Sequence, residues 1–303
     1  MIGSCKIRTD LALESREKFE KDNVEIEGVV LKRRKEDPGD ICTTLVEIQT
    51  EHGARVMEKP CGRYITVEAP DLVTAEEKVQ EKAAEILAGH LRRMLPKRKG
   101  DLSVLAVGLG NREVTPDALG PLVVQKLQIT RHVVKEYGNS GLEDGPFCMV
   151  SSIAPGVMAQ TGMETVEILK GIVGETQPDI VLAVDALAAR SIRRLNCTVQ
   201  LTDTGISPGS GVMNFRSGIS RETLGVPVIG IGVPTVVDAA SIVHDAVSQL
   251  LETLEESEIE EFLAELITPG LQRMFVTPKD VDEALEILSG IVAEGINLAL
   301  RQV

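Results

Sequence analysis

Hydrophobic residues follow two different patterns along the chain. Between residues 24 and 69 they alternate with polar ones, at 24 and 26 and over 29–31, 41–48 and 64–67, with turn residues at 37–40 and at His52-Gly53. A period of two broken by turns predicts a small antiparallel β-meander. Thr74 is then expected to cap a helix whose apolar residues recur every 3.6 positions and which ends before Pro96.

Beyond residue 100 the apolar runs become continuous. Residues 102–107, 180–184 and 228–231 form unbroken apolar runs, each followed by a loop and a helical pattern. Such runs are typical of strands buried on both faces, so we expect an α/β fold with a mostly parallel sheet flanked by helices and a β-rich N-terminal extension. Helical patterns over 237–254 and 281–300 close the chain. Residues 1–23 are polar and unpatterned, and are expected to form an arm outside the core.

The charge and composition of the chain exclude several classes of function. The 303 residues carry 32 Lys and Arg against 46 Asp and Glu, a formal net charge of −14, which repels phosphate backbones, so direct nucleic-acid binding is not expected. No apolar run approaches the ~18–20 residues of a membrane span, and the N-terminus lacks the apolar stretch of a secretory signal. The 5 cysteines form no CxxC pair, which favours a reducing cytosol over a disulfide framework or a zinc knuckle.

Two glycine motifs do not support the functions they first suggest. The turn Gly108-Leu109-Gly110-Asn111 follows a buried strand, but Glu113 stands where a dinucleotide fingerprint needs its third glycine. The stretch from Gly205 to Gly209 matches the GxSxG pattern of serine hydrolases. Its Pro208, however, has no N–H for an oxyanion. Neither a nucleotide site nor a serine triad is expected.

Two aspartates remain as candidates for chemistry. Asp185 interrupts the apolar run over 180–189 at the carboxyl end of a buried strand, and Asp117 lies a few residues past the 108–111 turn. Ligands of α/β sheets bind outside the carboxyl ends of the strands, so the two side chains can converge there. Asp117 could equally serve as a helix N-terminal charge. Two close carboxylates cannot both ionise cheaply, which gives an acid and a base able to activate water.

Several segments resemble the germination protease family of endospore-forming bacteria. The matching segments span nearly the whole chain: residues 8–12, 108–111, 115–121, 154–158, 184–191, 208–212, 233–238 and 276–279. The resemblance implies an aspartic-type endopeptidase, made as a zymogen, that initiates degradation of small acid-soluble spore proteins during germination. It further implies a homotetramer in the cytoplasm of the forespore or the spore core, without a cofactor. The family's two essential aspartates fall on Asp117 and Asp185.

The resemblance also raises a metal-assisted alternative. The fold is similar to that of hydrogenase-maturation peptidases, which place a metal ligand at each of the two aspartate positions and a histidine in a later loop. The corresponding residues 202–212 contain no histidine. An aspartate pair acting on water is therefore favoured over a metal-assisted peptidase of that type. A catalytically silent ligand-binding module is the alternative from another class.

The N-terminal arm resembles a substrate of the family. Family substrates are cut after Glu in Thr/Ser-Glu-Ile/Phe-Ala sequences, and Thr9-Asp10-Leu11-Ala12 has this pattern with Asp in place of Glu. This predicts autocleavage between Asp10 and Leu11, and three parts: a propeptide arm (1–10), a β-meander with its helix (11–96) and an α/β peptidase core (97–303).

The residue before the cut implies a basic pocket. A site for an acidic side chain should contain Arg or Lys. Arg112, Arg131, Arg190 and Arg193 lie near the motifs, and Arg112 and Arg190 are singled out as candidate substrate-binding residues.

Overall fold

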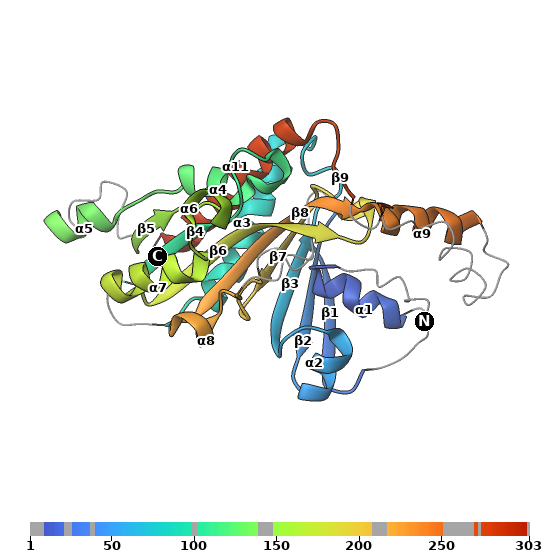
Figure 1. The fold of residues 1–303 in the computed structure, drawn as a ribbon, viewed down its shortest axis with the longest axis horizontal. Helices are drawn as coiled ribbons and strands as arrows, with labels where there is room; N and C mark the ends of the chain where they lie inside the picture. The colour runs from blue at the N-terminus through green and yellow to red at the C-terminus, as the bar shows by residue number, and fades with distance from the viewer. Residues whose placement is uncertain are drawn as a thin grey trace.

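The strands of the chain form one continuous sheet. The computed structural model describes residues 9–20, 26–36, 40–97, 102–138, 148–207, 217–250, 270–271 and 274–301. Within them nine strands are ordered β1-β2-β3-β7-β8-β6-β4-β5, with β9 added to β8 (Figure 1). Their bounds are β1 Val29–Glu36, β2 Ile41–Ile48, β3 Gly62–Glu68, β4 Ser103–Gly108, β5 Met149–Ile153, β6 Ile180–Ala189, β7 Thr198–Thr202, β8 Val228–Asp238 and β9 Phe275–Val276.

The sheet has a parallel half and an antiparallel half. Strands β5, β4, β6 and β8 run parallel and form what we call the parallel half. Strands β1, β2, β3 and β7 run antiparallel and form the antiparallel half, which joins the other through the β7–β8 pair. The predicted α/β class and the predicted β-meander are both confirmed. Because β7 enters antiparallel between β3 and β8, the meander extends the core sheet, and the sheet as a whole is mixed.

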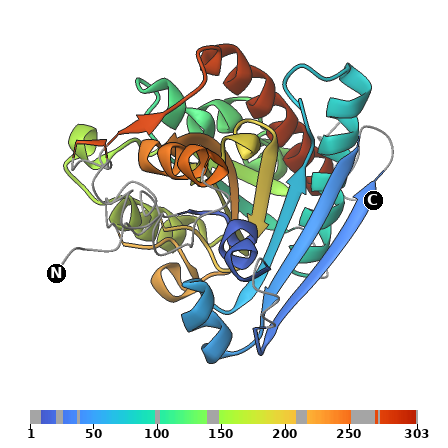
Figure 2. The ribbon, with the colours of Figure 1, turned by 90° about the vertical axis from the view of Figure 1, so that its right-hand side faces the viewer.

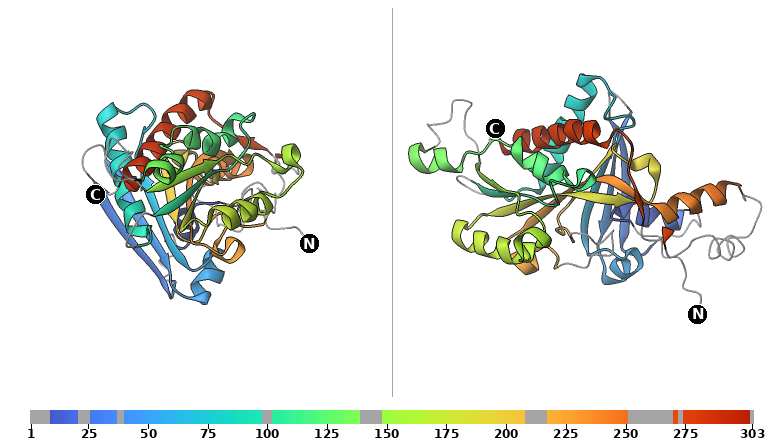
Figure 3. Two further views of the ribbon diagram at one scale, coloured as in Figure 1. Left: turned by 90° about the vertical axis from the view of Figure 1, so that its left-hand side faces the viewer. Right: turned by 45° about the horizontal axis from the view of Figure 1, so that its top comes forward.

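Helices cover both faces of this sheet (Figures 2 and 3). Helices α3, α4 and α11 pack on one face, where Leu87, Val123 and Leu288 join the largest apolar cluster. On the opposite face α7 and α8 cover the parallel half, and α1 and α2 lie against the antiparallel half. The helix bounds are α1 Ala12–Glu20, α2 Glu51–Met57, α3 Glu77–Met94, α4 Leu119–Gln125, α5 Arg131–Tyr137, α6 Met158–Thr161, α7 Thr165–Thr176, α8 Arg221–Leu224, α9 Ala239–Leu250 and α11 Val281–Leu300, with 3-10 turns η1 Thr115–Asp117 and η3 Ile192–Arg194.

Element boundaries follow the predictions in part. The helix expected over 281–300 is confirmed, and α3 ends at Met94, before Pro96 as expected. Thr74 does not cap α3, because that helix begins at Glu77 and the Thr74 hydroxyl donates to the carbonyl of Asp71. His52-Gly53 does not form a turn but lies inside α2, whose N-cap Thr50 accepts the Gly53 N–H.

The first residues of the described chain belong to the core, contrary to the expectation that 1–23 form an outer arm. Leu11, Ala12 and Leu13 are fully buried, and α1 follows directly. Leu11 packs against Leu187 on β6, and Ala12 joins a cluster with Met57 of α2. Residues 1–8 and 21–25 lie outside the described residues. Within the described part of the chain no helix is both long and apolar enough to span a membrane.

Candidate active site

Asp185 lies at the point on β6 where its neighbour β4 ends. The β4–β6 ladder stops at the pair Gly108–Val184, while β6 itself continues to Ala189. Asp185 is therefore the first β6 residue past the end of β4, although it is not the end of its own strand as the sequence suggested. The side chain is 6% exposed, and its Oδ1 accepts the N–H of Ala186 at 3.0 Å. A buried carboxylate thus stands at a strand end, the position outside which ligands bind in α/β sheets.

Asp117 is brought to the same place by the turn that leaves β4. The N–H of Leu109 donates to the carbonyl of Val184 at 2.8 Å, and the N–H of Asn111 donates to Oδ2 of Asp117 at 2.7 Å. Gly110 has φ +106°, and a Cβ there would lie 2.0 Å from the Asp117 carbonyl oxygen. Only glycine permits this backbone and this approach. The carboxylate of Asp117 thus caps the turn and does not cap a helix.

A second close approach presses the start of α4 against β6. A Cβ on Gly120 would lie 2.5 Å from the carbonyl oxygen of Val184, the residue before Asp185. The turn η1, which ends in Asp117, contacts both β6 and β8. The sequence-predicted pair Asp117 and Asp185 is therefore carried on elements that meet at one strand end.

Thr235 holds η1 from the β8 side. The ladder between β6 and β8 shifts register after Leu187, which leaves Thr235 as the extra residue of a bulge. Its hydroxyl, which is fully buried, donates to the carbonyl of Pro116 at 2.6 Å, next to Asp117. Thr277 donates to the Thr235 carbonyl at 2.9 Å. Bulges commonly re-aim a side chain beside a functional site, and this one fixes the backbone that carries Asp117.

A row of residues in register links Asp185 to the antiparallel half. Asp185 pairs with Gly232 on β8, and Gly232 pairs with Gln200 on β7. Residues directly opposite each other point to the same face of a sheet, and strands are about 4.8 Å apart, so the Gln200 backbone lies roughly 10 Å from that of Asp185. Gly232 has no side chain, and Leu187 occupies the space above it. The buried side chain of Gln200 therefore lies on the same face of the sheet as the side chain of Asp185.

The chain's own residues 9–12 pack on this face of the sheet, against β6 and β7. The Asp10 N–H donates to the carbonyl of Ala188 on β6 at 3.0 Å, and the Ala188 N–H donates to Oδ2 of Asp10 at 2.9 Å. The carbonyl oxygen of Asp10 accepts two further bonds, from Nζ of Lys59 at 3.0 Å and from Nε2 of Gln200 at 3.2 Å. The Ala12 N–H donates to Oε1 of the same Gln200 at 2.8 Å. Gln200 therefore spans the peptide bond between Asp10 and Leu11, with one amide atom on either side of it.

Leu11 fills an apolar recess beside these contacts. Its side chain is 0% exposed and packs against Leu187, Ala189 and Val237. The recess lies on the face of β6 that carries Asp185, two residues before Leu187. In this chain a buried apolar residue therefore follows the bond that Gln200 spans.

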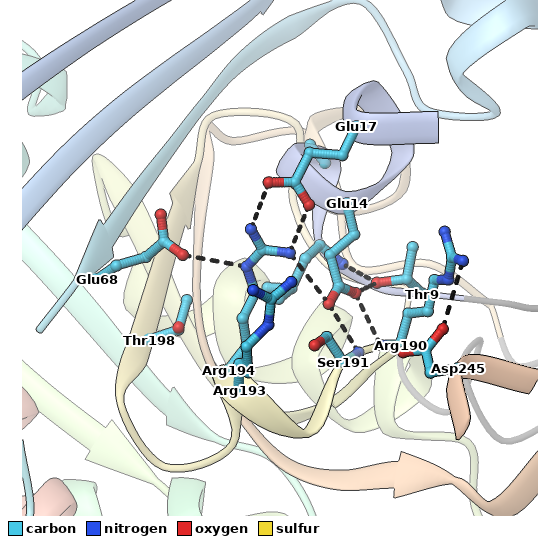
Figure 4. Close-up of polar contacts among 12 residues, drawn as sticks. Thr9, Glu14, Glu17, Glu68, Arg190, Ser191, Arg193, Arg194, Thr198 and Asp245 are labelled. Atoms are coloured by element: carbon cyan, nitrogen blue, oxygen red, sulfur yellow. Dashed lines mark hydrogen bonds and ion pairs between the residues drawn. The ribbon is translucent and has the colours of Figure 1, made fainter. Parts of the chain in front are cut away.

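Glu14 anchors the segment at its other end. Its carboxylate accepts the backbone N–H groups of Arg190 at 2.7 Å and of Ser191 at 3.0 Å, just beyond β6 (Figure 4). The Thr9 hydroxyl also donates to Glu14, and it accepts the Leu11 N–H at 3.0 Å. The turn from Thr9 into α1 is thereby closed on itself and tied to the sheet.

Arg194 joins this anchor to three carboxylates. Its guanidinium contacts Glu17 at 2.6 Å, Glu68 at 3.1 Å and Glu14 at 3.3 Å (Figure 4). Burial alone lowers the pKa of Arg194, but the hydrogen bonds to Glu17 and the charges of Glu17, Glu14 and Glu68 raise this pKa above its ordinary value. The guanidinium remains charged, and it links α1 to β3 and to the loop after β6.

The side chains of Arg112 and Arg190, the two singled-out sequence candidates, contact residues outside this segment. With the Gln125 amide turned so that its oxygen faces Arg112, that oxygen, at the end of α4, lies 2.5 Å from Nη1 of Arg112. The Arg190 guanidinium faces Asp245 on α9 at 3.6 Å. Their role as a pocket for an acidic side chain stays a prediction. The 208–212 motif lies outside the described residues. Among the residues that the structure does describe, no group of three or more His, Cys, Asp or Glu could hold a metal ion.

Sequence reasoning missed Lys59 and Gln200. Lys59 directly follows the left-handed residue Glu58 that ends α2, a helix read from sequence as a turn. Gln200 lies in β7, a strand of five residues with no long apolar run. The signal that could have found Gln200 is its alternation, because a polar residue flanked by Val199 and Leu201 should face away from the core that those two enter.

A peptide segment that is held through its main chain on the sheet face of the strand-end residue Asp185 is typical of a peptidase site on an α/β sheet. The comparisons with known proteins agree. A family model described as germination protease matches residues 7–257. The germination protease of Caldanaerobacter subterraneus subsp. tengcongensis is 44% identical over 318 residues, covering 99% of this chain and 96% of the relative. Those of Clostridium tetani (42% over 315 residues, 97% and 95%) and Bacillus pumilus (38% over 357 residues, 99% and 95%) are also similar.

The chain therefore belongs to the germination protease family and is a peptidase. Among solved structures, the NiFe hydrogenase maturation protease HycI of Thermococcus kodakarensis matches 65% of this chain and 94% of its own length, at 17% identity and a TM-score of 0.31.

Proposed function

We propose that the protein is an aspartic-type endopeptidase, made as a zymogen, that cuts its own chain between Asp10 and Leu11. In spores it would then initiate the breakdown of small acid-soluble spore proteins at similar sites, with Glu before the cut. It would act in the forespore or spore core as a homotetramer. The names of the relatives support the spore setting.

The observation that carries the proposal is how residues 9–12 are held. The bond between Asp10 and Leu11 is flanked by hydrogen bonds on both sides, with its carbonyl on Lys59 and Gln200 and the next N–H on Gln200. Main-chain bonds of this kind accept any peptide of suitable shape, while the Leu11 recess selects an apolar residue after the cut. The same site can therefore hold the arm first and a substrate afterwards.

In the proposed chemistry Asp117 and Asp185 share the acid and base roles. Two neighbouring carboxylates hold one proton between them, so one is a base and the other an acid at the same pH. The base takes a proton from water as its oxygen attacks the carbonyl carbon of Asp10. The acid gives a proton to the Leu11 nitrogen as the C–N bond breaks. Hydrolysis is thereby completed with the pair returned to its starting state.

N-terminal sequencing of the protein after activation tests the proposal. We expect wild-type chains to begin at Leu11, and Asp117→Asn chains, free of other proteases, to stay full length. A mature chain that begins well away from Leu11, or trimming that persists in Asp117→Asn, would mean that the arm is removed by another route.

Substitutions of Asp10 extend the test. Asp10→Glu should be processed at least as fast as wild type, since Glu precedes the cut in the proposed substrates. Asp10→Lys should be processed at least about tenfold more slowly, because its charge repels the Lys59 ammonium that bonds the Asp10 carbonyl. Equal rates for all three chains would contradict selection at this position.

A further inference from the structure

We propose that Lys59 and Gln200 form the oxyanion hole of the peptidase, so that both are catalytic residues besides the aspartate pair. The inference rests on the proposed function, because it takes the bond between Asp10 and Leu11 as the one that is cut. Both side chains already touch the atom on which charge would develop.

The geometry matches what an oxyanion hole requires. Donors of an oxyanion hole lie about 2.7–3.1 Å from the oxygen that becomes negative. Nζ of Lys59 lies 3.0 Å from the Asp10 carbonyl oxygen, and Nε2 of Gln200 lies 3.2 Å from it. Because these distances belong to the uncut peptide, the bonds have room to shorten as the oxygen gains charge.

The two donors are held by the fold and not by the peptide alone. Gln200 is 6% exposed and stands in the middle of β7, paired on both sides by β3 and β8. Its amide is also oriented by the Ala12 N–H, which occupies Oε1 and so turns Nε2 towards the carbonyl of Asp10. Lys59 is half-buried and follows the capped end of α2, where its own N–H donates to the carbonyl of Ala54. Donors fixed in this way need little reorganisation during the reaction.

The chemistry divides between the two halves of the sheet. As the water oxygen bonds to the carbonyl carbon of Asp10, the aspartate pair takes the water proton, and the electron pair of the C=O bond moves to the carbonyl oxygen. The Lys59 ammonium and the Gln200 amide stabilise that negative oxygen. When the intermediate collapses, the C=O bond re-forms, the C–N bond breaks and the pair protonates the Leu11 amine. Lys59 keeps its proton throughout, so atoms and charge balance.

Kinetics of two near-isosteric variants test the inference. Lys59→Met removes the ammonium and keeps the stem, and Gln200→Glu removes the donor and keeps the acceptor for the Ala12 N–H. Removing one donor of an oxyanion hole lowers the rate about 100- to 1,000-fold. We expect a loss of this size in the autoprocessing rate of each full-length variant. We also expect it in kcat, rather than KM, of the processed enzyme on a Thr-Glu-Ile-Ala peptide. Lys82→Met, which removes a partly exposed lysine of α3, is the matched control and should process at the wild-type rate.

A second readout separates chemistry from docking. In an Asp185→Asn background that cannot cut, hydrogen exchange at the Asp10 and Ala12 amides reports whether the segment is docked, because these amides bond Ala188 on β6 and Gln200 on β7. Protection that is unchanged by Lys59→Met, together with the rate loss above, supports the oxyanion role. Lost protection would mean that Lys59 only docks the arm, and wild-type kcat in both variants would overturn the inference. Either failure leaves wild-type chains starting at Leu11, whereas failure of the proposed function moves that start.

Discussion

The parallel and antiparallel halves of the sheet contribute different chemical groups to the proposed site. The parallel half supplies acidity, with Asp185 on β6 and Asp117 on the turn that leaves β4. The antiparallel half supplies hydrogen-bond donors, with Gln200 on β7 and Lys59 just before β3. In the proposed mechanism, a peptide laid between the two halves is held by these donors and cut by the aspartate pair. The proposed site therefore depends on β7, which joins the meander to the core sheet.

The largest expected effect comes from the acidic half. Asp117→Asn and Asp185→Asn are nearly isosteric and remove only charge and proton. Each should lower peptidase turnover on the order of 100- to 10,000-fold while circular dichroism shows an unchanged fold. The double variant should be little worse than either single one, because groups that act as a unit are not additive. A tenth of wild-type turnover in Asp185→Asn would contradict the assignment.

The next effect concerns the anchor that fastens α1 to both halves. Arg194→Leu leaves Glu14, which is 2% exposed, without its charge partner. Breaking a buried ion pair costs roughly 3–5 kcal/mol, which urea unfolding would measure. Arg33→Leu breaks an exposed pair with Glu17 and serves as the control, at about 1 kcal/mol or less. Equal losses in both variants would show that burial does not strengthen the anchor.

A smaller effect is expected where β8 supports the acidic turn. Thr235→Val keeps the shape and removes the hydroxyl that donates to the Pro116 carbonyl. An unmet buried acceptor costs about 1–3 kcal/mol in free energy of unfolding. Because Asp117 follows Pro116 directly, kcat should fall more than KM rises. Loss of stability with an unchanged kcat would mean that the bulge supports the fold but does not position Asp117.

The smallest effect is a pH dependence on α3, the helix behind the antiparallel half. Burial lowers the pKa of His90, and the charge of Arg93 lowers it further. The unfolded chain therefore binds a proton there at a higher pH than the folded chain does. This makes stability fall as pH decreases through the ordinary histidine pKa near 6.5. His90→Gln should flatten part of this slope in unfolding curves between pH 7.5 and pH 5.5, roughly the window around that value. An unchanged slope would contradict it.

The two halves also differed in how far the sequence predicted them. Asp185 stood out because a carboxylate interrupts an apolar run that must be buried, and burial of an unused charge is costly. Gln200 gave no such signal, because polar residues alternate with apolar ones in any half-buried strand. Lys59 was missed because the helix before it was not predicted. A helix as short as α2 has too few turns to show a helical period in the sequence. The register that aligns Asp185 with Gln200 depends on how the strands pair. Strand pairing is a tertiary property, and the hydrophobic periodicity of the sequence does not predict it.

The family resemblance and the physical argument from the residues agreed on the pair Asp117 and Asp185, but they differed on residues 1–23. The family implied a cut between Asp10 and Leu11, and composition alone made those residues part of a polar tail. Their burial comes from contacts far along the chain, with Ala188 and Gln200. Such contacts cannot be read from residues 1–23 themselves, which is why the expected outer arm was wrong for residues 11–15.

A crystal structure of the full-length Asp185→Asn protein tests the central claim most directly, because it captures the uncut peptide between the two halves. We expect the Asp10 carbonyl oxygen on Lys59 and Gln200. We also expect a water on Asp117 about 3–3.5 Å from the carbonyl carbon, the separation of a reactant poised to attack. An Asp10 carbonyl turned away from both donors, or a carbon farther than about 6 Å from the Asp117 carboxylate, beyond the reach of one bridging water, would contradict the account.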